Sequence, residues 1–263
     1  MIELLNRTNE LFGATICCHN DPAHPCHCIT CLQGGFYGEP DTYNCIKKLC
    51  SYVMNYGPCY SSEMFHFLSA DHLLENNYNN SQMNILSLGC GFCPDWFGIN
   101  KYISDKRLTI TYNYRGIDSQ ELWSQLREGV SNATYQYFDL LNGFNLSGFD
   151  LIIVNKLFST LQSIDQHNIF LAILVREIQN SMAVGSHLIF NDANHQNKGR
   201  DIFDNAIQQY FREIRRYKFN IDNPYGRQYI NINSINNVFV YPNNLAIIPK
   251  PTVTKAVVFV YRK

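Results

Sequence analysis

Short runs of consecutive apolar residues alternate with amphipathic stretches over most of the chain, from residue 84 onward. Continuous apolar runs are typical of strands buried on both faces, and apolar residues three or four positions apart are typical of helices. The runs predict strands at 84–88, 108–117, 135–138, 149–154, 187–190, 229–232, 238–241 and 257–261, and the other stretches predict helices at 96–103, 120–127, 166–180 and 202–214. Strands separated by helices predict a parallel sheet that is covered on both faces.

A glycine-rich turn follows the first predicted strand, with the sequence Gly89-Cys90-Gly91. A turn of this kind between a strand and a helix is the context that nucleotide binding requires, because glycine lets the backbone approach the ligand closely. Ligands of such sheets bind at the carboxyl ends of the strands, which here carry Gly89, Gly91, Asp118, Asp139 and Asn155. Other roles stay open: a tight turn for the glycines, a helix cap for Asp118, a turn for Asp139 and a redox Cys-x-x-Cys pair for Cys90 and Cys93.

The amino-terminal part of the chain is rich in cysteine. Eight of the ten cysteines lie between residues 17 and 59, three histidines are interleaved with them, and prolines and glycines indicate a loop there. The spacing of Cys28 and Cys31 lets two thiolates reach one ion, and zinc suits thiolate and imidazole ligands. The candidate metal ligands are Cys17, Cys18, Cys26, Cys28, Cys31 and Cys45. Buried thiols, redox cysteines and disulfides are the alternatives, and Cys50 fits the apolar face of a helix at 45–56.

Composition limits the classes of function. The 263 residues include 21 basic and 22 acidic ones, a formal charge of −1 that excludes a generally basic nucleic-acid binder. A local cluster of Arg212, Arg215, Arg216 and Lys218 could still bind RNA, but it is better interpreted as the solvated end of the last helix. No apolar run is long enough for a membrane span and no secretory signal is evident, which predicts a cytoplasmic protein without membrane contact.

The motifs from residue 84 to 263 resemble the class I S-adenosylmethionine-dependent methyltransferases. Residues 85–91 are similar to the first motif of that family, 116–118 to the strand-two acid that holds the ribose, 138–140 to the adenine-contacting segment, and 149–155 to the fourth-strand motif. The resemblance implies an α/β, Rossmann-like, doubly wound and mostly parallel sheet with an antiparallel last strand. It also implies S-adenosylmethionine as cofactor, bound by Leu88, Gly89, Cys90, Gly91, Asp95, Asp118, Ser119, Phe138, Asp139, Leu140 and Asn155.

Asn155, at the end of the fourth strand, is the candidate catalytic residue, placed to position the substrate or the methionine end of the cofactor. The family usually has an acid two residues before the first glycine, where this chain has Ser87, and Asp95 is a candidate substitute. The third glycine of the motif is replaced by Cys93. We therefore expect a zinc-binding module over residues 1–73 and a methyltransferase domain over 74–263 that acts on an unidentified acceptor. A non-catalytic interaction protein and an RNA methyltransferase are the alternatives.

Overall fold

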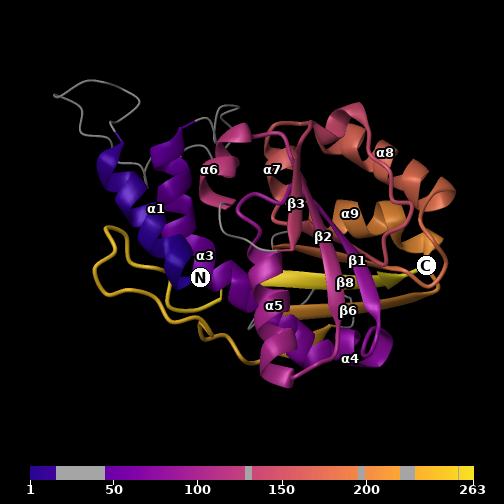
Figure 1. Ribbon diagram of the computed structural model, residues 1–263. Helices are drawn as coiled ribbons and strands as arrows, with labels where there is room; N and C mark the ends of the chain where they lie inside the picture. Colours follow the sequence, from indigo (N-terminus) through magenta and orange to yellow (C-terminus); the bar gives the residue numbers. More distant parts are fainter. Residues whose placement is uncertain (16–44, 128–131, 195–198, 220–228, 254) are drawn as a thin grey trace.

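The computed structural model describes residues 1–15, 45–127, 132–194, 199–219, 229–253 and 255–263 (Figure 1). Its helices are α1 (Ile2–Ala14), α3 (Ile46–Asp71), α4 (Leu73–Asn77), α5 (Pro94–Lys106), α6 (Ser124–Arg127), α7 (Phe158–Ser163), α8 (His167–Asn180) and α9 (Arg200–Ile207). Its strands are β1 (Gln82–Leu88), β2 (Thr111–Asp118), β3 (Ala133–Tyr137), β4 (Leu151–Asn155), β5 (His187–Ala193), β6 (Glu213–Phe219), β7 (Ile230–Ile232) and β8 (Ala256–Arg262). Short 3-10 turns follow β2, β3 and α9: η1 (Glu121–Trp123), η2 (Leu140–Asn142) and η4 (Gln208–Tyr210).

The strands form one sheet in the order β3-β2-β1-β4-β5-β8-β6-β7. The first five strands of this order run parallel, and β8 pairs antiparallel with both β5 and β6. The predicted α/β class, the mostly parallel sheet and the antiparallel last strand are thus confirmed. As expected, β1 lies inside the sheet, between β2 and β4, so the turn that follows it opens where the strand order reverses.

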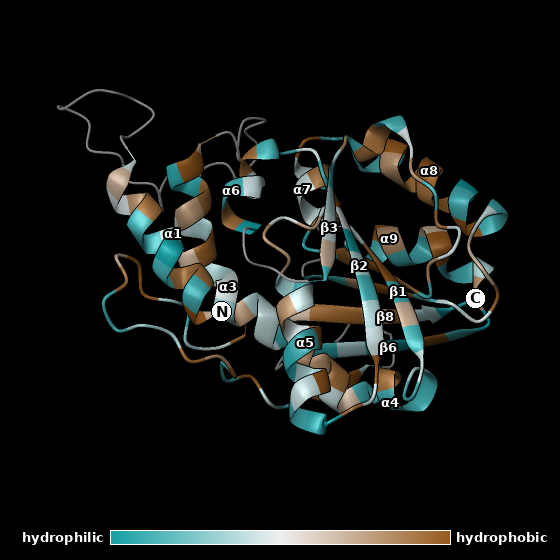
Figure 2. Ribbon diagram, viewed as in Figure 1, coloured by the Kyte–Doolittle hydropathy of each residue, from teal (hydrophilic) through white to brown (hydrophobic). Residues whose placement is uncertain are grey.

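Helices cover both faces of the sheet and form three layers with it (Figure 1). Alternate residues of β1 enter different cores: Met83 and Ile85 pack with α1, α3 and α5, whereas Leu86 and Leu88 pack with α7, α8 and α9. A strand buried on both sides has no polar face, which explains the continuous apolar runs. Figure 2 shows this pattern in β8, which is mostly hydrophobic, while α8 carries hydrophilic and hydrophobic residues side by side.

The helices before the sheet share a hydrophobic core with it. Leu5 of α1 and Leu49 of α3 belong to the same buried cluster as Ile85 of β1. The sequence predicts a helix at 45–56, but α3 continues to Asp71 and contains Pro58. The helix therefore reaches from the cysteine-rich segment to the edge of the sheet, and the division of the chain near residue 73 stays a prediction.

Two predicted elements are wrong. The helix expected at 202–214 ends at Ile207, and the basic residues assigned to its solvated end lie in or just before β6. Pairing of β6 with the buried strand β8 overrides the helical spacing, because it places Tyr217 and Phe219 in the core. The run 238–241 is not a strand, since the Val238 N–H donates to the Ser62 hydroxyl of α3 and Val240 is 74% exposed.

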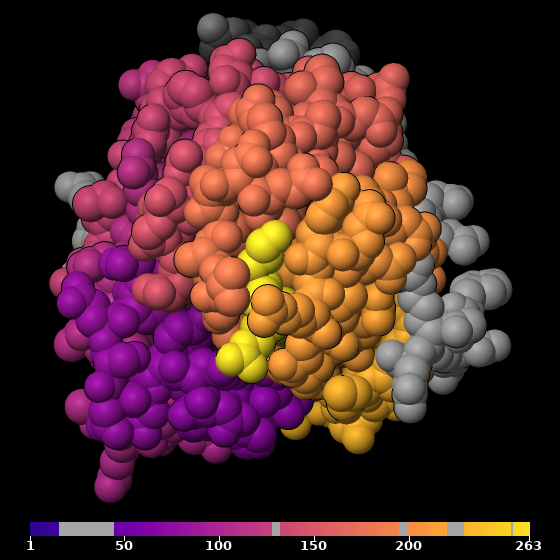
Figure 3. Space-filling model, turned by 90° about the vertical axis from the view of Figure 1, so that its right-hand side faces the viewer, coloured from indigo at the N-terminus to yellow at the C-terminus, as the bar shows by residue number. Residues whose placement is uncertain are grey.

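The carboxyl terminus lies on the side of the sheet away from the glycine turn. Arg262 pairs with His187, the first residue of β5, so β8 ends where the parallel strands begin. Figure 3 shows this end of the chain in yellow, at the surface between the segments of α8–β5 and α9–β6. Within the residues described above, no helix has the length and hydrophobicity needed to cross a bilayer.

Candidate functional site

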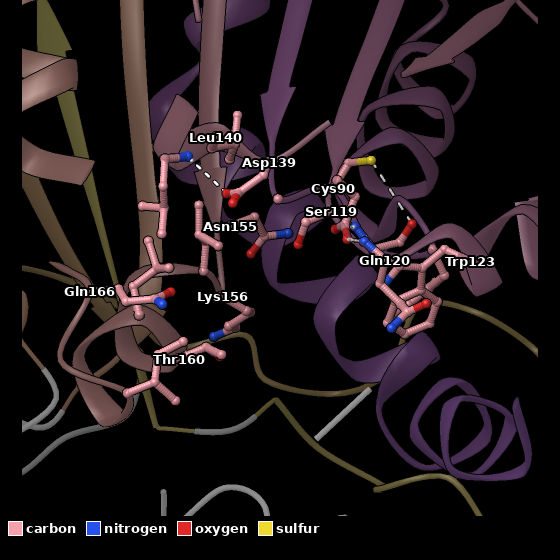
Figure 4. A pocket seen from close by; sticks show the side chains of 18 of the residues that line it. Cys90, Ser119, Gln120, Trp123, Asp139, Leu140, Asn155, Lys156, Thr160 and Gln166 are labelled. Atoms are coloured by element: carbon pink, nitrogen blue, oxygen red, sulfur yellow. Dashed lines mark hydrogen bonds between the residues drawn. The ribbon is translucent and has the colours of Figure 1, made fainter. Parts of the chain in front are cut away.

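A cavity of about 470 Å³ opens at the carboxyl ends of β1, β2 and β4, between the glycine turn and α7 (Figure 4). The structure brings most of the predicted site residues together in its wall: Gly89, Cys90, Gly91, Asp118, Ser119, Asp139, Leu140 and Asn155. It does not bring Leu88, Asp95 or Phe138 into this wall. The sheet thus collects residues that are up to 66 positions apart, as expected for the carboxyl edge of parallel strands.

The glycine turn has a backbone that side chains would disturb. Gly89 and Gly91 have φ angles of +67° and +51°, in the left-handed region that favours glycine. A Cβ on Gly89 would lie 2.7 Å from a methyl carbon of Leu157, so any other residue there would also displace the Leu157 side chain. The N–H groups of Gly89 and Cys90 both donate to the carbonyl of Ile117, which ties the turn to the end of β2.

Asp118 connects the end of β2 to this turn. Its Oδ2 accepts from the Gly91 N–H at 2.8 Å, and its Oδ1 accepts from the Gln120 N–H at 2.9 Å. Burial raises the pKa of Asp118, while these hydrogen bonds and the charge of Arg127 oppose the rise. Each carboxylate oxygen has a second lone pair, so Asp118 can also accept from hydroxyls in the cavity.

Asp139 and Leu140 approach the cavity from the end of β3. The Asp139 side chain is exposed and accepts from the Leu141 N–H at 2.9 Å, which caps the 3-10 turn η2. Leu140 is buried beside it and gives the cavity an apolar surface. Asp139 therefore has the structural role in a turn that the sequence analysis left open. Its hydrogen bond with the Leu141 N–H also holds Leu140 in place.

Asn155 ends β4 and is 5% exposed, yet among the residues that the structure describes neither its amide oxygen nor its amide nitrogen has a hydrogen-bond partner. An unpartnered buried amide is costly, by about 1–3 kcal/mol for each group. Figure 4 shows its side chain in the middle of the cavity wall, pointing toward Ser119. Asn155 can therefore offer one donor and one acceptor to a ligand.

Lys156 follows in a strained conformation, with φ +57°. Its ammonium lies 2.6 Å from Oε2 of Glu63, which is fully buried on α3, and 4.8 Å from the ring centre of Tyr60. Asn191 of β5 donates to the same Glu63 oxygen at 3.2 Å. The ion pair links α3 to the end of β4 and fixes Lys156 in the cavity wall.

Asp95 lies below the cavity, at the start of α5. It is fully buried, and the Tyr114 hydroxyl lies 3.1 Å from each of its carboxylate oxygens. Burial raises the pKa of Asp95 to about 6, although its hydrogen bonds oppose the rise. Ser87, where the family has an acid, is fully buried, and its hydroxyl is among the groups that oppose this rise. Asp95 thus connects the start of α5 to Tyr114 of β2, and it is not among the residues that line the cavity.

Five of the six predicted metal ligands lie outside the residues that the structure describes, so the structure does not test the predicted zinc site. These five are Cys17, Cys18, Cys26, Cys28 and Cys31, and Cys45 precedes the first turn of α3 as a free thiol. Among the residues that the structure does describe, no three His, Cys, Asp or Glu side chains form a group that could hold a metal ion.

Solved structures with a similar fold are methyltransferases. N-methyltransferase NodS from Bradyrhizobium japonicum WM9, solved with S-adenosylhomocysteine, aligns with a TM-score of 0.50 at 14% identity, over 90% of this chain and 99% of its own. The plantazolicin methyltransferase BpumL, also solved with that product, aligns with a TM-score of 0.47 at 12% identity, over 99% of both chains. No protein-family model matches the sequence, and no curated protein matches it.

The chain has the Rossmann-like methyltransferase fold.

The sequence motifs predicted eight residues of the cavity wall and missed most of the others. The residues missed are Tyr52, Phe92, Pro94, Gln120, Trp123, Leu141, Leu157, Thr160, Leu161, Ile164 and Gln166. Tyr52 comes from α3 and its ring centre lies 6.0 Å from that of Trp123, so an aromatic wall joins segments 71 residues apart. A periodic pattern assigns such residues to a core, and only the folded arrangement shows that they also face a cavity. Lys156, a weak sequence candidate, is in the wall.

Proposed function

We propose that this protein transfers a methyl group from S-adenosylmethionine to an acceptor bound in the same cavity. The observation that carries the proposal is the cavity itself, in which a glycine turn, a strand-two carboxylate and an unpartnered strand-four amide meet at the carboxyl edge of a methyltransferase fold. When bound, S-adenosylmethionine supplies a methyl group activated by its sulfonium. The chain then has to orient the two reactants and exclude water, rather than supply strong acid–base groups.

Each cavity residue has a specific part in this proposal. Gly89 and Gly91 let the backbone approach the methionine end, and Asp118 accepts hydrogen bonds from the ribose hydroxyls. Leu140, held by the Asp139 turn, packs against the adenine. The Asn155 amide forms hydrogen bonds with the methionine end of the cofactor or with the acceptor, so the Asn155 side chain lies beside the methyl group.

Isothermal titration with S-adenosylmethionine and S-adenosylhomocysteine tests this function. We expect one site with a dissociation constant in the micromolar range, typical of specific binding worth about 8 kcal/mol. No heat of binding at millimolar ligand would refute the enzyme and favour an interaction protein, which Ser87 in place of the acid usual in the family also suggests. A mobility-shift assay with RNA at low salt tests the RNA alternative, for which the formal charge of −1 predicts weak binding.

We also propose zinc for the cysteine-rich segment, on the ligand spacing in the sequence. Purified protein should contain zinc, and Cys28→Ser should lower both the zinc content and the melting temperature, because structural zinc contributes folding free energy. Cys50→Ser, at a buried position of α3, is the matched control and should leave the zinc content unchanged. Elemental analysis decides the matter: metal-free protein with disulfides in this segment would show that zinc is the wrong assignment.

A further inference from the structure

Two cysteines of the glycine turn, Cys90 and Cys93, have thiols that no step of the proposed function uses. The Cys93 N–H donates to the Cys90 carbonyl at 2.7 Å, so residues 90–93 form a β-turn. Such a turn brings its first and last Cα atoms within about 7 Å, and disulfides join Cα atoms about 4.4–6.8 Å apart. The backbone thus already holds the two cysteines at a separation close to the one that a disulfide needs.

The two side chains lie in the same buried space below the cavity. Cys90 is 2% exposed and Cys93 is fully buried, and both are free thiols. Burial raises the pKa of Cys90 well above its ordinary value, and the neighbouring Cys93 side chain raises it further. Cys93 also has φ +66°, a left-handed conformation in which a side chain is strained. Strained residues of this kind gather at functional positions.

A buried guanidinium accompanies the thiols. Arg127 is 6% exposed and its Nε donates to the Gly91 carbonyl at 2.5 Å, while its Nη2 has no hydrogen-bond partner within the described part of the chain. Its positive charge acts on both Cys90 and Cys93. The charge opposes part of the rise in the pKa of Cys90, but burial outweighs it, so the closed turn keeps this thiol protonated.

We propose that Cys90 and Cys93 form a reversible disulfide that lowers the affinity of the cofactor site, an inference that rests on the proposed function of that site. The oxidant is a low-molecular-weight disulfide. The Cys90 thiolate attacks one of its sulfur atoms, the bond between the two sulfurs breaks, and the released thiolate takes up the proton that Cys90 lost. The Cys93 thiolate then attacks the Cys90 sulfur and releases the second small thiol, which takes the proton of Cys93. Two electrons pass from the cysteines to the oxidant.

The disulfide acts on the cofactor site through the turn. The Cys90 sulfur packs so closely on β2 that a Cβ on Gly116 would lie 2.6 Å from it. Bonding this sulfur to Cys93 withdraws it from that position and twists the turn at Gly91, whose N–H and carbonyl are bound by Asp118 and Arg127. Because both thiols are buried, the reaction requires the turn to open, and a ligand in the cavity keeps it closed.

The test uses the full-length protein, oxidised glutathione and S-adenosylhomocysteine. Peptide mapping by mass spectrometry follows the Cys90–Cys93 disulfide, and titration calorimetry measures the affinity before oxidation, after it and after reduction with dithiothreitol. Cys93→Gly removes one thiol and suits the left-handed backbone, and Cys93→Ser is a second variant of the same position. Cys50→Ser, a buried thiol of α3 outside the cavity, is the matched control.

We expect oxidation to lower the affinity of wild type and Cys50→Ser by roughly tenfold or more, and reduction to restore it. In either Cys93 variant the mixed disulfide at Cys90 cannot be resolved, so oxidation should leave glutathione bound to Cys90 and produce no intramolecular disulfide. S-adenosylhomocysteine should slow disulfide formation in the wild type. The inference is overturned if no Cys90–Cys93 disulfide forms while the reduced protein binds the ligand, or if the disulfide forms and the affinity stays the same. Reduced protein that binds no ligand would instead refute the proposed function, and with it the effect of the disulfide.

Discussion

At the scale of single residues, Asp118 holds the glycine turn as well as lining the cavity. Because its carboxylate accepts from two backbone N–H groups, Asp118→Ala leaves both donors without a partner. We expect the variant to lose about 2–4 kcal/mol of unfolding free energy without ligand, and its affinity for S-adenosylhomocysteine to fall roughly tenfold to a hundredfold. Urea denaturation and titration calorimetry measure the two effects. Asp139→Ala, which removes one bond of an exposed carboxylate, is the comparison and should lose less than about 1 kcal/mol. Unchanged affinity in Asp118→Ala would make Asp118 a structural residue only.

The raised pKa of Asp95 predicts how the stability of the protein depends on pH. Its pKa is raised to about 6 in the folded protein, whereas an unfolded chain releases this proton near pH 3.9. Between these values the native state binds more protons than the unfolded state, so the contribution of Asp95 to the unfolding free energy falls as pH rises from about 4 to 6. Asp95→Asn does not titrate. Its unfolding free energy relative to wild type should therefore rise over this interval and stay level above it.

Urea denaturation of both proteins at half-unit pH steps measures this difference. Asp105→Asn, in an exposed ion pair with Lys101, is the control and should show no such rise. A flat difference between Asp95→Asn and wild type from pH 4 to 6 would contradict the raised pKa.

At the scale of elements, α3 is attached to β6 by a buried carboxylate. Asp71, the last residue of α3, accepts from Nε and Nη2 of Arg215 at 2.7 and 3.0 Å and from the Tyr217 hydroxyl at 2.6 Å. Its side chain is fully buried, so Asp71→Ala removes three hydrogen bonds, although Arg215 is 26% exposed and keeps its pair with Glu213. The variant should lose about 2–3 kcal/mol of unfolding free energy. Asp105→Ala, which breaks the exposed pair on α5, should cost less than about 1 kcal/mol. Equal losses in the two variants, measured by chemical denaturation, would show that the attachment contributes nothing.

At the scale of the whole molecule, local patterns predicted the parallel part of the sheet and the residues at its carboxyl edge. The prediction succeeded there because residues such as Ile85 and Ile153 are buried in the core by the sheet itself, and the apolar run of each strand therefore indicates the strand directly. The local pattern assigned Arg215 to a solvated helix end, because its partner Asp71 is 144 residues away and lies outside any short stretch of sequence. The aromatic wall of Tyr52 and Trp123 was missed for the same reason, since a cavity is a property of several elements at once.

The cofactor should stabilise the whole fold, because it binds where several elements of the sheet end. At a ligand concentration one hundred times its dissociation constant the gain is about 2.7 kcal/mol, which raises the melting temperature of a domain of this size by roughly 5–10 °C. Gly91→Val places a branched side chain on a residue of the cavity wall whose backbone is left-handed. Gly148→Val is the control: its φ is +79°, and a Cβ added there would have no atom of the described residues within 4 Å. Both variants should melt below wild type without ligand, because their backbones are strained. Only Gly91→Val should lose the shift with S-adenosylhomocysteine. If Gly148→Val lost it as well, general destabilisation would account for the result, and if Gly91→Val kept it, the ligand would bind elsewhere than against this turn.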